Sequence, residues 1–312
     1  MLSSGWEITI FLLTLLIIQP PKCDGTPGKT KENKPVSFVA HKIGVADKDE
    51  DRYIQIENCA DSGIGVFAVL DGHGGKASAE DAKEHLENSI AAYLKSNRVK
   101  GEKLNAEDML KEVIGTAESE LKRKFLLDQT RKHGTTCIIA IAEKEKLTVA
   151  NVGDSRAVLC KMNNELKRLS TDHNIPNQKE IERIHGANDR LWFRPGHRAR
   201  FAGLETTRTV GDFDRKEDHH ALIADPEFEF IDFSKDEPKF MILASDGLWA
   251  VMENEEAVEF IKDRYKQPDH GANDLVEKAF QRTKDDITVI IVDFEKGHYE
   301  VSSAHTCPKS IE

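Results

Sequence analysis

Residues 66 to 75 read VFAVLDGHGG, an apolar run that ends in a carboxylate, an imidazole and three glycines. A run of this length that is rich in Val predicts a strand buried on both faces. Glycine allows the main chain to bend sharply or to approach a ligand closely. The stretch therefore predicts a core strand that ends at a cleft, with Asp71 and His73 as candidate functional side chains. For the dipeptide Asp71-Gly72 alone, a polar turn is the simpler interpretation.

The composition limits the class of protein. The chain has 312 residues, of which 39% are hydrophobic and 32% are charged, as is typical of soluble globular domains. Its formal net charge of -11 argues against nucleic-acid binding, because a nucleic-acid-binding protein needs a basic surface to neutralise phosphates. We therefore expect no nucleic-acid partner, and we expect a monomer.

The N-terminal segment differs from the rest of the chain. Residues 8 to 18 (ITIFLLTLLII) form an uncharged apolar run of eleven, followed by QPPKCDG. This pattern fits a secretory signal better than a membrane span of about 20 residues. We predict a signal peptide or short anchor at 1–25 and a linker at 26–35, although Glu7 and the lack of Lys or Arg before the run are atypical. The expected location is the secretory pathway or the exterior, with the cytoplasm as the alternative, and only the N-terminal segment would contact a membrane.

The cysteines predict neither a disulfide scaffold nor a zinc site, because they are few and scattered and no CxxC spacing occurs. Up to two disulfides in an oxidising compartment and free buried thiols both remain open. The five positions are Cys23, Cys59, Cys137, Cys160 and Cys307.

The remaining pattern predicts one α+β domain at 36–295, followed by a C-terminal tail at 296–312, because no linker or repeat interrupts it. Two successive segments, 79–94 and 110–125, carry apolar residues at helical three- and four-residue steps. Around them lie hairpin-like strand candidates, which favour antiparallel sheets in a sandwich with helices outside. The strand candidates are 37–45, 53–56, 64–70, 135–142, 147–152, 156–162, 240–245 and 287–294.

Acidic residues recur where these strands and turns end. If such carboxylates meet at one end of a sheet, each raises the pKa of the others unless cations neutralise them. Oxygen ligands without Cys or clustered His select hard ions, so Mg²⁺ or Mn²⁺ is the expected metal. Two such ions about 3.5 to 4 Å apart would bridge a hydroxide and polarise a phosphoryl oxygen. The candidates are Glu50, Asp51, Asp71, Asp154, Asp246, Asp285 and Asp286.

Seven motifs, in order and at matching spacing, resemble those of the metal-dependent protein serine/threonine phosphatases of type 2C (the PPM family) over about residues 36 to 295. The resemblance implies a β-sandwich of two antiparallel sheets flanked by helices on both outer faces. It also implies metal-dependent hydrolysis of phosphoserine and phosphothreonine in phosphoprotein substrates. The motifs are VFAVLDGHGG, KHGTTCIIAI, VANVGDSRAVL, TDHNIPNQKEIERI, LETTRTVGDF, FMILASDGLW and KDDITVIIV.

The resemblance implies a binuclear Mg²⁺ or Mn²⁺ centre. On the family pattern Asp71 bridges both ions, Gly72 gives its carbonyl oxygen to one of them, and Asp246 and Asp285 bind the other. The remaining positions are Glu50 and Asp51, which act through metal-bound waters, and Asp154, which with Asp246 holds a weaker third ion.

The expected mechanism is direct attack on phosphorus by a water shared between the two ions, without a covalent phosphoenzyme. His73 stands two residues from the bridging ligand and is the expected general acid for the leaving serine or threonine oxygen. On the family pattern, residues 172 to 201 form a flap beside the site, where substrate choice is thought to lie.

One departure from the family pattern affects phosphate binding. Family members typically carry an arginine four residues before the Glu of the first motif, and Ala46 stands at that position here. Loss of a bidentate guanidinium should weaken phosphate binding. Either a flap arginine such as Arg194 or Arg198 binds the substrate instead, or the chain is a phosphatase-fold binding or regulatory module with weak or no activity.

Overall fold

The structure, a computed structural model, describes residues 35–45, 48–192 and 199–295. The segments expected to be a signal peptide and a tail, and almost all of the expected linker, lie outside these residues, as do Ala46, Arg194 and Arg198. Within the described ranges, no helix has the length and apolar character required to cross a membrane.

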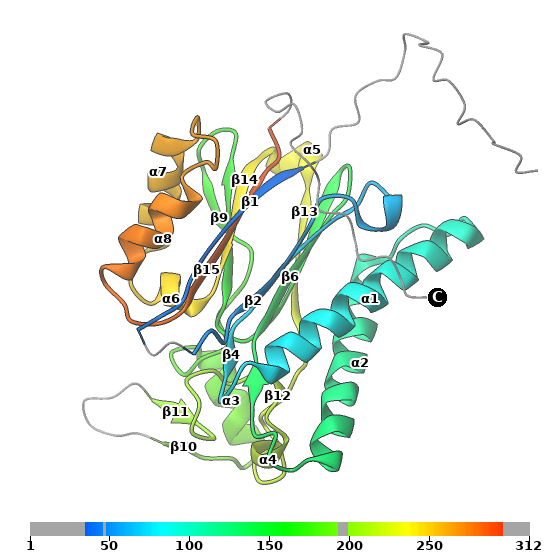
Figure 1. The fold of residues 1–312 in the computed structure, drawn as a ribbon, viewed down its shortest axis with the longest axis vertical. Coiled ribbons are helices and arrows are strands. Elements are labelled where there is room, and N and C mark those ends of the chain that lie inside the picture. The colour runs from blue at the N-terminus through cyan, green and yellow to red at the C-terminus, as the bar shows by residue number, and fades with distance from the viewer. Residues whose placement is uncertain (1–34, 46–47, 193–198, 296–312) are drawn as a thin grey trace, which may run out of the picture. The chain divides into compact units, whose positions relative to one another are not determined.

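Two five-stranded antiparallel sheets form the centre of the described domain (Figure 1). The first sheet has the order β1 (Val36–Lys42), β15 (Ile287–Asp293), β14 (Pro238–Ala244), β8 (Arg156–Lys161) and β9 (Leu166–Arg168). The second sheet has the order β13 (Glu227–Asp232), β7 (Lys146–Val152), β6 (Cys137–Ala142), β3 (Gly65–Leu70) and β2 (Arg52–Ile56).

Strand β3 shows why these segments read as unbroken apolar runs. All six of its residues are buried. Successive side chains of a strand point to opposite faces, so Phe67 and Val69 pack in the cluster between the sheets. Val66 and Leu70 pack in the separate cluster beneath the helices. A strand covered on both faces therefore needs apolar residues at every position.

Helices cover the outer face of each sheet (Figure 1). Helices α1 (Ala77–Lys100) and α2 (Ala106–Leu127) pack on the second sheet. Helices α6 (Asp246–Trp249), α7 (Asn254–Arg264) and α8 (Ala272–Phe280) pack on the first. The α+β sandwich with helices on both outer faces is therefore confirmed.

Smaller elements lie at one end of the sandwich. A three-stranded sheet joins β4 (Gly72–His73), β5 (Gly134–Thr135) and β12 (Val210–Gly211), and α4 (Phe213–Lys216) follows it. The segment expected to be a flap contains α3 (Gln178–Gly186) and the ribbon of β10 (Leu191–Trp192) and β11 (Arg200–Phe201). It has a small apolar core of its own, which includes Ile184 and Phe201. The other short elements are η1 (Cys59–Asp61) and α5 (Phe233–Asp236).

The structure corrects the sequence predictions in detail. Each predicted strand and helix is present with bounds that differ by a few residues, but β9, β13 and the short strands of the smaller sheets were not predicted. Three of the five cysteines fall within the described residues and all three are buried, and Cys137 and Cys160 carry free thiols. The free-thiol alternative therefore holds for Cys137 and Cys160.

Candidate metal centre and active site

Asp71 directly follows β3, and hydrogen bonds fix its main chain on both sides. Its N–H donates to Thr136 Oγ1 at 3.0 Å, and the N–H of Thr136 donates to the Asp71 carbonyl oxygen at 2.9 Å. The Thr136 hydroxyl also pairs with Ser155 Oγ at 2.8 Å. One threonine thus connects Asp71 to the turn that carries Asp154.

The segments of Gly72 and Glu50 are in close contact. A Cβ atom added to Gly72 would come within 2.5 Å of the Glu50 carbonyl oxygen, so only glycine fits at this position. The Gly75 N–H donates to Glu50 Oε1 at 2.6 Å. These contacts place the main chain of Gly72 and the carboxylate of Glu50 on the same side of the site as Asp71.

Asp286 holds the loop that precedes β2. Its carboxylate is buried and accepts hydrogen bonds from the N–H groups of Gly44 at 2.6 Å and Glu50 at 2.7 Å. A Cβ atom on Gly247 would overlap with the Asp286 carbonyl oxygen, so the turns that carry Asp246 and Asp285 pack directly against each other. The sequence predicted an acidic candidate at Asp286 but not this structural task.

The electrostatics show that the predicted carboxylates share one site. Burial raises the pKa of Asp71 well above its usual value, and four carboxylates, Asp51, Asp246, Asp154 and Asp285, raise it further. Burial is also the largest cause that raises the pKa of Asp154, and the charge of Asp246 is the next largest. Burial also raises the pKa of Asp51 to about 7, although hydrogen bonds from Thr288 and Ser245 act in the opposite direction.

This cluster fits divalent cations. In the part of the chain that the structure describes, Asp51, Asp71 and Asp154 form no salt bridge, and the strongest charges acting on Asp71 are all negative. Cations would relieve this repulsion. Carboxylate and carbonyl oxygens are the ligands that Mg²⁺ and Mn²⁺ prefer. Five of the predicted candidates, Asp51, Asp71, Asp154, Asp246 and Asp285, therefore lie together and offer oxygen donors that suit such ions.

His73 pairs with a residue that the sequence analysis did not identify. Its Nε2 lies 2.7 Å from Oδ2 of Asp212, which is fully buried. Burial acts in the opposite direction, but the hydrogen bond and charge of His73 lower the pKa of Asp212. The ionised carboxylate therefore accepts the Nε2–H, and Nδ1 is the ring nitrogen that Asp212 does not engage.

A glycine makes the contact between His73 and Asp212 possible. His73 belongs to β4 and Asp212 follows β12, and these two strands flank β5. A Cβ atom on Gly134, in the middle strand, would overlap with Asp212 Oδ2 and lie 2.8 Å from His73 Nε2. The Gly-Asp pair within LETTRTVGDF is a sequence signal that could have indicated Asp212, but its partner could not be read from the sequence.

A pocket of about 480 Å³ adjoins the carboxylate cluster at Asp154 and Asp246. Its wall includes Trp249 and Arg156, whose guanidinium donates to both oxygens of Asp172 at 3.0 and 2.5 Å. The Arg156 guanidinium also lies 5.2 Å from the centre of the Trp249 ring.

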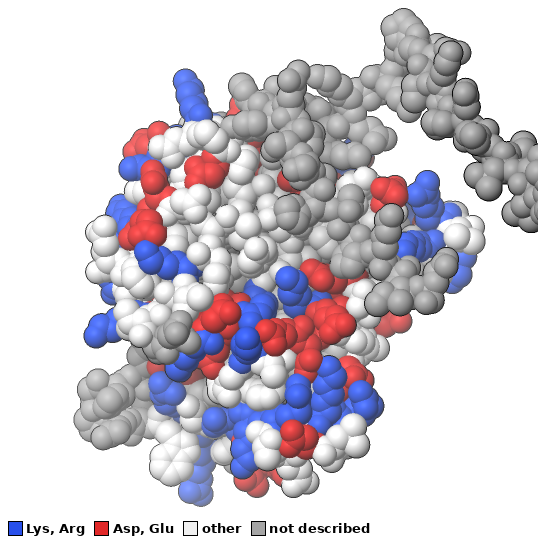
Figure 2. Space-filling view, in the orientation of Figure 1, with Lys and Arg blue, Asp and Glu red and all other residues white. Residues whose placement is uncertain are grey.

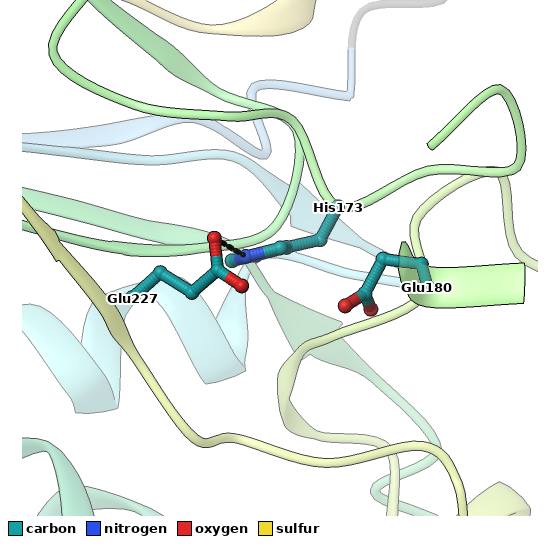
Figure 3. A group of neighbouring side chains, drawn as sticks. All are labelled: His173, Glu180 and Glu227. Carbon is teal, nitrogen blue, oxygen red and sulfur yellow. Dashed lines mark ion pairs between the residues drawn. The ribbon is translucent and has the colours of Figure 1, made fainter. Parts of the chain in front are cut away.

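A second group of ligand-type residues, His173, Glu180 and Glu227, lies outside this cluster (Figure 3). The two carboxylates of this group already form ion pairs with Arg208, which lies 2.6 Å from Glu180 and 3.0 Å from Glu227. Burial opposes ionisation of Glu180, but hydrogen bonds from Arg208, Arg183 and Thr207 lower the pKa of Glu180 to about 2. We therefore interpret this group as an ion-pair network and not as a metal site.

This network supports the turn that carries Asp154. His173 Nδ1 accepts the Gly153 N–H at 3.0 Å, and the His173 N–H donates to the Gly153 carbonyl oxygen at 2.9 Å. The neutral ring therefore has its proton on Nε2, which lies 3.5 Å from Glu227. Burial lowers the pKa of His173, in agreement with a neutral ring.

Charged side chains of both signs gather on the face shown in Figure 2, near β4 and the start of α1, below a broad uncharged area. Among the charged residues of this region, Arg52 donates to Glu80 at 2.6 Å, and Lys124 and Arg131 both pair with Asp81. Arg52, Lys124 and Arg131 are thus each paired with an acidic side chain.

Comparison with known proteins gives consistent matches. The sequence model of the family described as Protein phosphatase 2C matches residues 39–287. The chain is 37% identical over 274 residues to Protein phosphatase 1L of Bos taurus, covering 86% of this chain and 75% of the bovine protein. It is 35% identical over 275 residues to Probable protein phosphatase 2C 59 of Arabidopsis thaliana, covering 86% and 82% of the two chains.

A solved structure gives the same fold. The serine-threonine phosphatase 2C from Toxoplasma gondii superposes with a TM-score of 0.72 at 21% identity, over 85% of this chain and 96% of that one.

Proposed function

This chain belongs to the protein phosphatase 2C family of metal-dependent protein serine/threonine phosphatases, and we propose that Asp71 is the residue that joins two divalent cations in its active site. The single observation that carries this proposal is the convergence of four other carboxylates on Asp71. Phosphoproteins are the substrates that the family implies.

The proposed ligands are those that the family pattern implies for this sequence. Asp71 would bridge the two ions, the Gly72 carbonyl oxygen would bind one, and Asp246 and Asp285 would bind the other. When bound, two such cations would lower the pKa of a water shared between them and neutralise the oxygens of the phosphoryl group. The supporting positions are Glu50 and Asp51 through water, and Asp154 with Asp246 for a weaker third ion.

The chain itself supplies the proton. We infer that His73 protonates the serine or threonine oxygen that leaves phosphorus. The bond from Nε2–H to Asp212 orients the ring, so that a proton on Nδ1 can be given to the leaving oxygen. Asp212 acts through His73 and is therefore a positioning residue.

Purified protein should release phosphate from a phosphothreonine peptide with Mg²⁺ or Mn²⁺, and EDTA should abolish the release. The expected reason is that the carboxylate cluster alone repels a phosphate dianion. A malachite-green assay with and without the metal measures this. A control adds excess Mn²⁺ after EDTA, which should restore the rate. Equal rates in EDTA and in Mn²⁺ would contradict the proposal.

The Ala46→Arg variant should lower KM for the peptide about tenfold or more if the metals alone hold the phosphate. A bidentate charge-assisted contact contributes roughly 1.5 to 3 kcal/mol where no other residue makes it. Steady-state kinetics at saturating Mn²⁺ measures the change. If a flap arginine already binds the phosphate, the same variant should change KM little, and Arg194→Ala or Arg198→Ala should raise it several-fold. Unchanged KM in all three variants would contradict both explanations.

The other expectations concern the surroundings of the enzyme. We propose that residues 1–25 direct the chain to the secretory pathway or anchor it, and that the domain acts as a monomer. The paired charges near β4 favour a protein substrate over a nucleic acid. Phosphatase activity, which the family establishes, replaces the alternative of an inactive binding module.

A further inference from the structure

A histidine outside the family motifs is connected to the carboxylate cluster by two hydrogen bonds. His41 on β1 stands directly opposite Thr288 on β15 in the antiparallel register. Opposed residues of this kind share a face of the sheet. Accordingly, His41 Nδ1 lies 2.8 Å from Thr288 Oγ1, and His41 Nε2 lies 3.2 Å from Asp49 Oδ1.

The second bond leads from Thr288 to Asp51. Thr288 Oγ1 donates to Asp51 Oδ2 at 2.8 Å, and both residues are buried. A threonine hydroxyl has a single hydrogen to donate. Once that hydrogen is committed to Asp51, the hydroxyl oxygen can only accept from His41 Nδ1–H. The hydrogen bonds therefore run from His41 through Thr288 to Asp51, which requires a proton on His41 Nδ1 besides any that Nε2 donates to Asp49.

Besides Thr288, one other side chain contributes to the orientation of Asp51. Ser245, at the end of β14, is its other side-chain hydrogen-bonding partner. The Ser245 hydroxyl in turn accepts the Thr288 N–H at 3.0 Å. Only the His41 end reaches solvent, with 24% of its side chain exposed. Replacing His41 would thus change the solvent-facing end of this hydrogen-bond series and leave the buried residues Thr288 and Asp51 in place.

We propose that His41 is a positioning residue for metal binding, because its Nδ1–H commits the Thr288 hydroxyl to Asp51 and fixes the orientation of that carboxylate. The inference rests on the proposed metal role of Asp51. Metal ligands are commonly held by such outer contacts, and loss of one typically lowers metal affinity 10- to 100-fold. His41 lies one bond further out, so we expect the lower end of that range.

The test compares two replacements of His41. His41→Leu should weaken Mn²⁺ binding about tenfold in calorimetric titration. His41→Asn should stay within about threefold of the wild type, since the Asn amide nitrogen can replace Nδ1 as donor. The matched control is His85→Leu on α1, where His85 Nε2 pairs with the Thr116 hydroxyl at 2.9 Å, and it should leave Mn²⁺ affinity unchanged.

A purely structural role for His41 would give a different pattern. In that case His41→Leu would lower the melting temperature of the metal-free protein and leave its Mn²⁺ affinity at the wild-type value, which would overturn the inference. Thr288→Val should also weaken binding, and adding His41→Leu to it should cause no further loss, because both act through one hydroxyl. A fully additive loss would overturn the inference. Absence of Mn²⁺ binding in the wild type would instead refute the proposed metal centre, and this inference with it.

Discussion

The Asp71→Asn variant should hydrolyse a phosphothreonine peptide at least about a thousandfold more slowly than the wild type at saturating Mn²⁺. An amide carries no charge and has a single acceptor oxygen, so it cannot join two cations as a carboxylate can. Initial rates from phosphate release measure the loss. The control is Asp232→Asn, at the other end of the sandwich, where Asp232 pairs across the strands with Lys146.

The same variant should not lose its fold. The Asp71 pKa is raised by burial and by neighbouring carboxylates, so removing this charge relieves repulsion in the metal-free protein. We expect an equal or higher melting temperature without metal, together with a smaller rise on adding Mn²⁺. An inactive variant that melts well below the wild type would not support the assignment. Activity within tenfold of the wild type would refute it.

The second large effect concerns the leaving group. His73→Gln should lower kcat for the phosphothreonine peptide by about 10² to 10⁴. It should affect p-nitrophenyl phosphate far less, because a nitrophenolate leaves without a proton donor. The measured quantity is the ratio of the two rates in the variant and in the wild type.

Asp212 provides an independent check on this role. Asp212→Asn keeps the size of the side chain but removes the carboxylate that accepts His73 Nε2–H and orients the ring. It should shift the rate ratio in the same direction as His73→Gln and by less. Equal losses on both substrates in the His73 variant would instead indicate that His73 serves binding and not protonation.

Much of the fold could be predicted because its central strands are buried on both faces. An apolar run such as that of β3 has few other structures available to it. Strand β13 was missed because it lies at a sheet edge and reads EFEFID, with one fully buried residue, Ile231. Its pattern of acidic and aromatic residues carries no continuous apolar signal.

The site was predicted less completely than the fold. The acidic residues at strand ends, together with the family resemblance, gave the proposed metal ligands, because each lies within a local motif. The pairing of His73 with Asp212 and the bonds from Gly44 and Glu50 to Asp286 join segments far apart in sequence. These contacts depend on the packing of the whole sandwich. Local sequence patterns therefore indicated the residues but not their partners.

The most direct test of the metal centre is a calorimetric count of Mn²⁺ bound to the purified wild type and to Asp71→Asn. If Asp71 joins two ions, the wild type should bind two Mn²⁺ tightly, with a weaker third at higher concentration. The variant should lose tight binding of at least one of the two. Tight binding of a single ion by the wild type, or of two ions by the variant, would contradict the account.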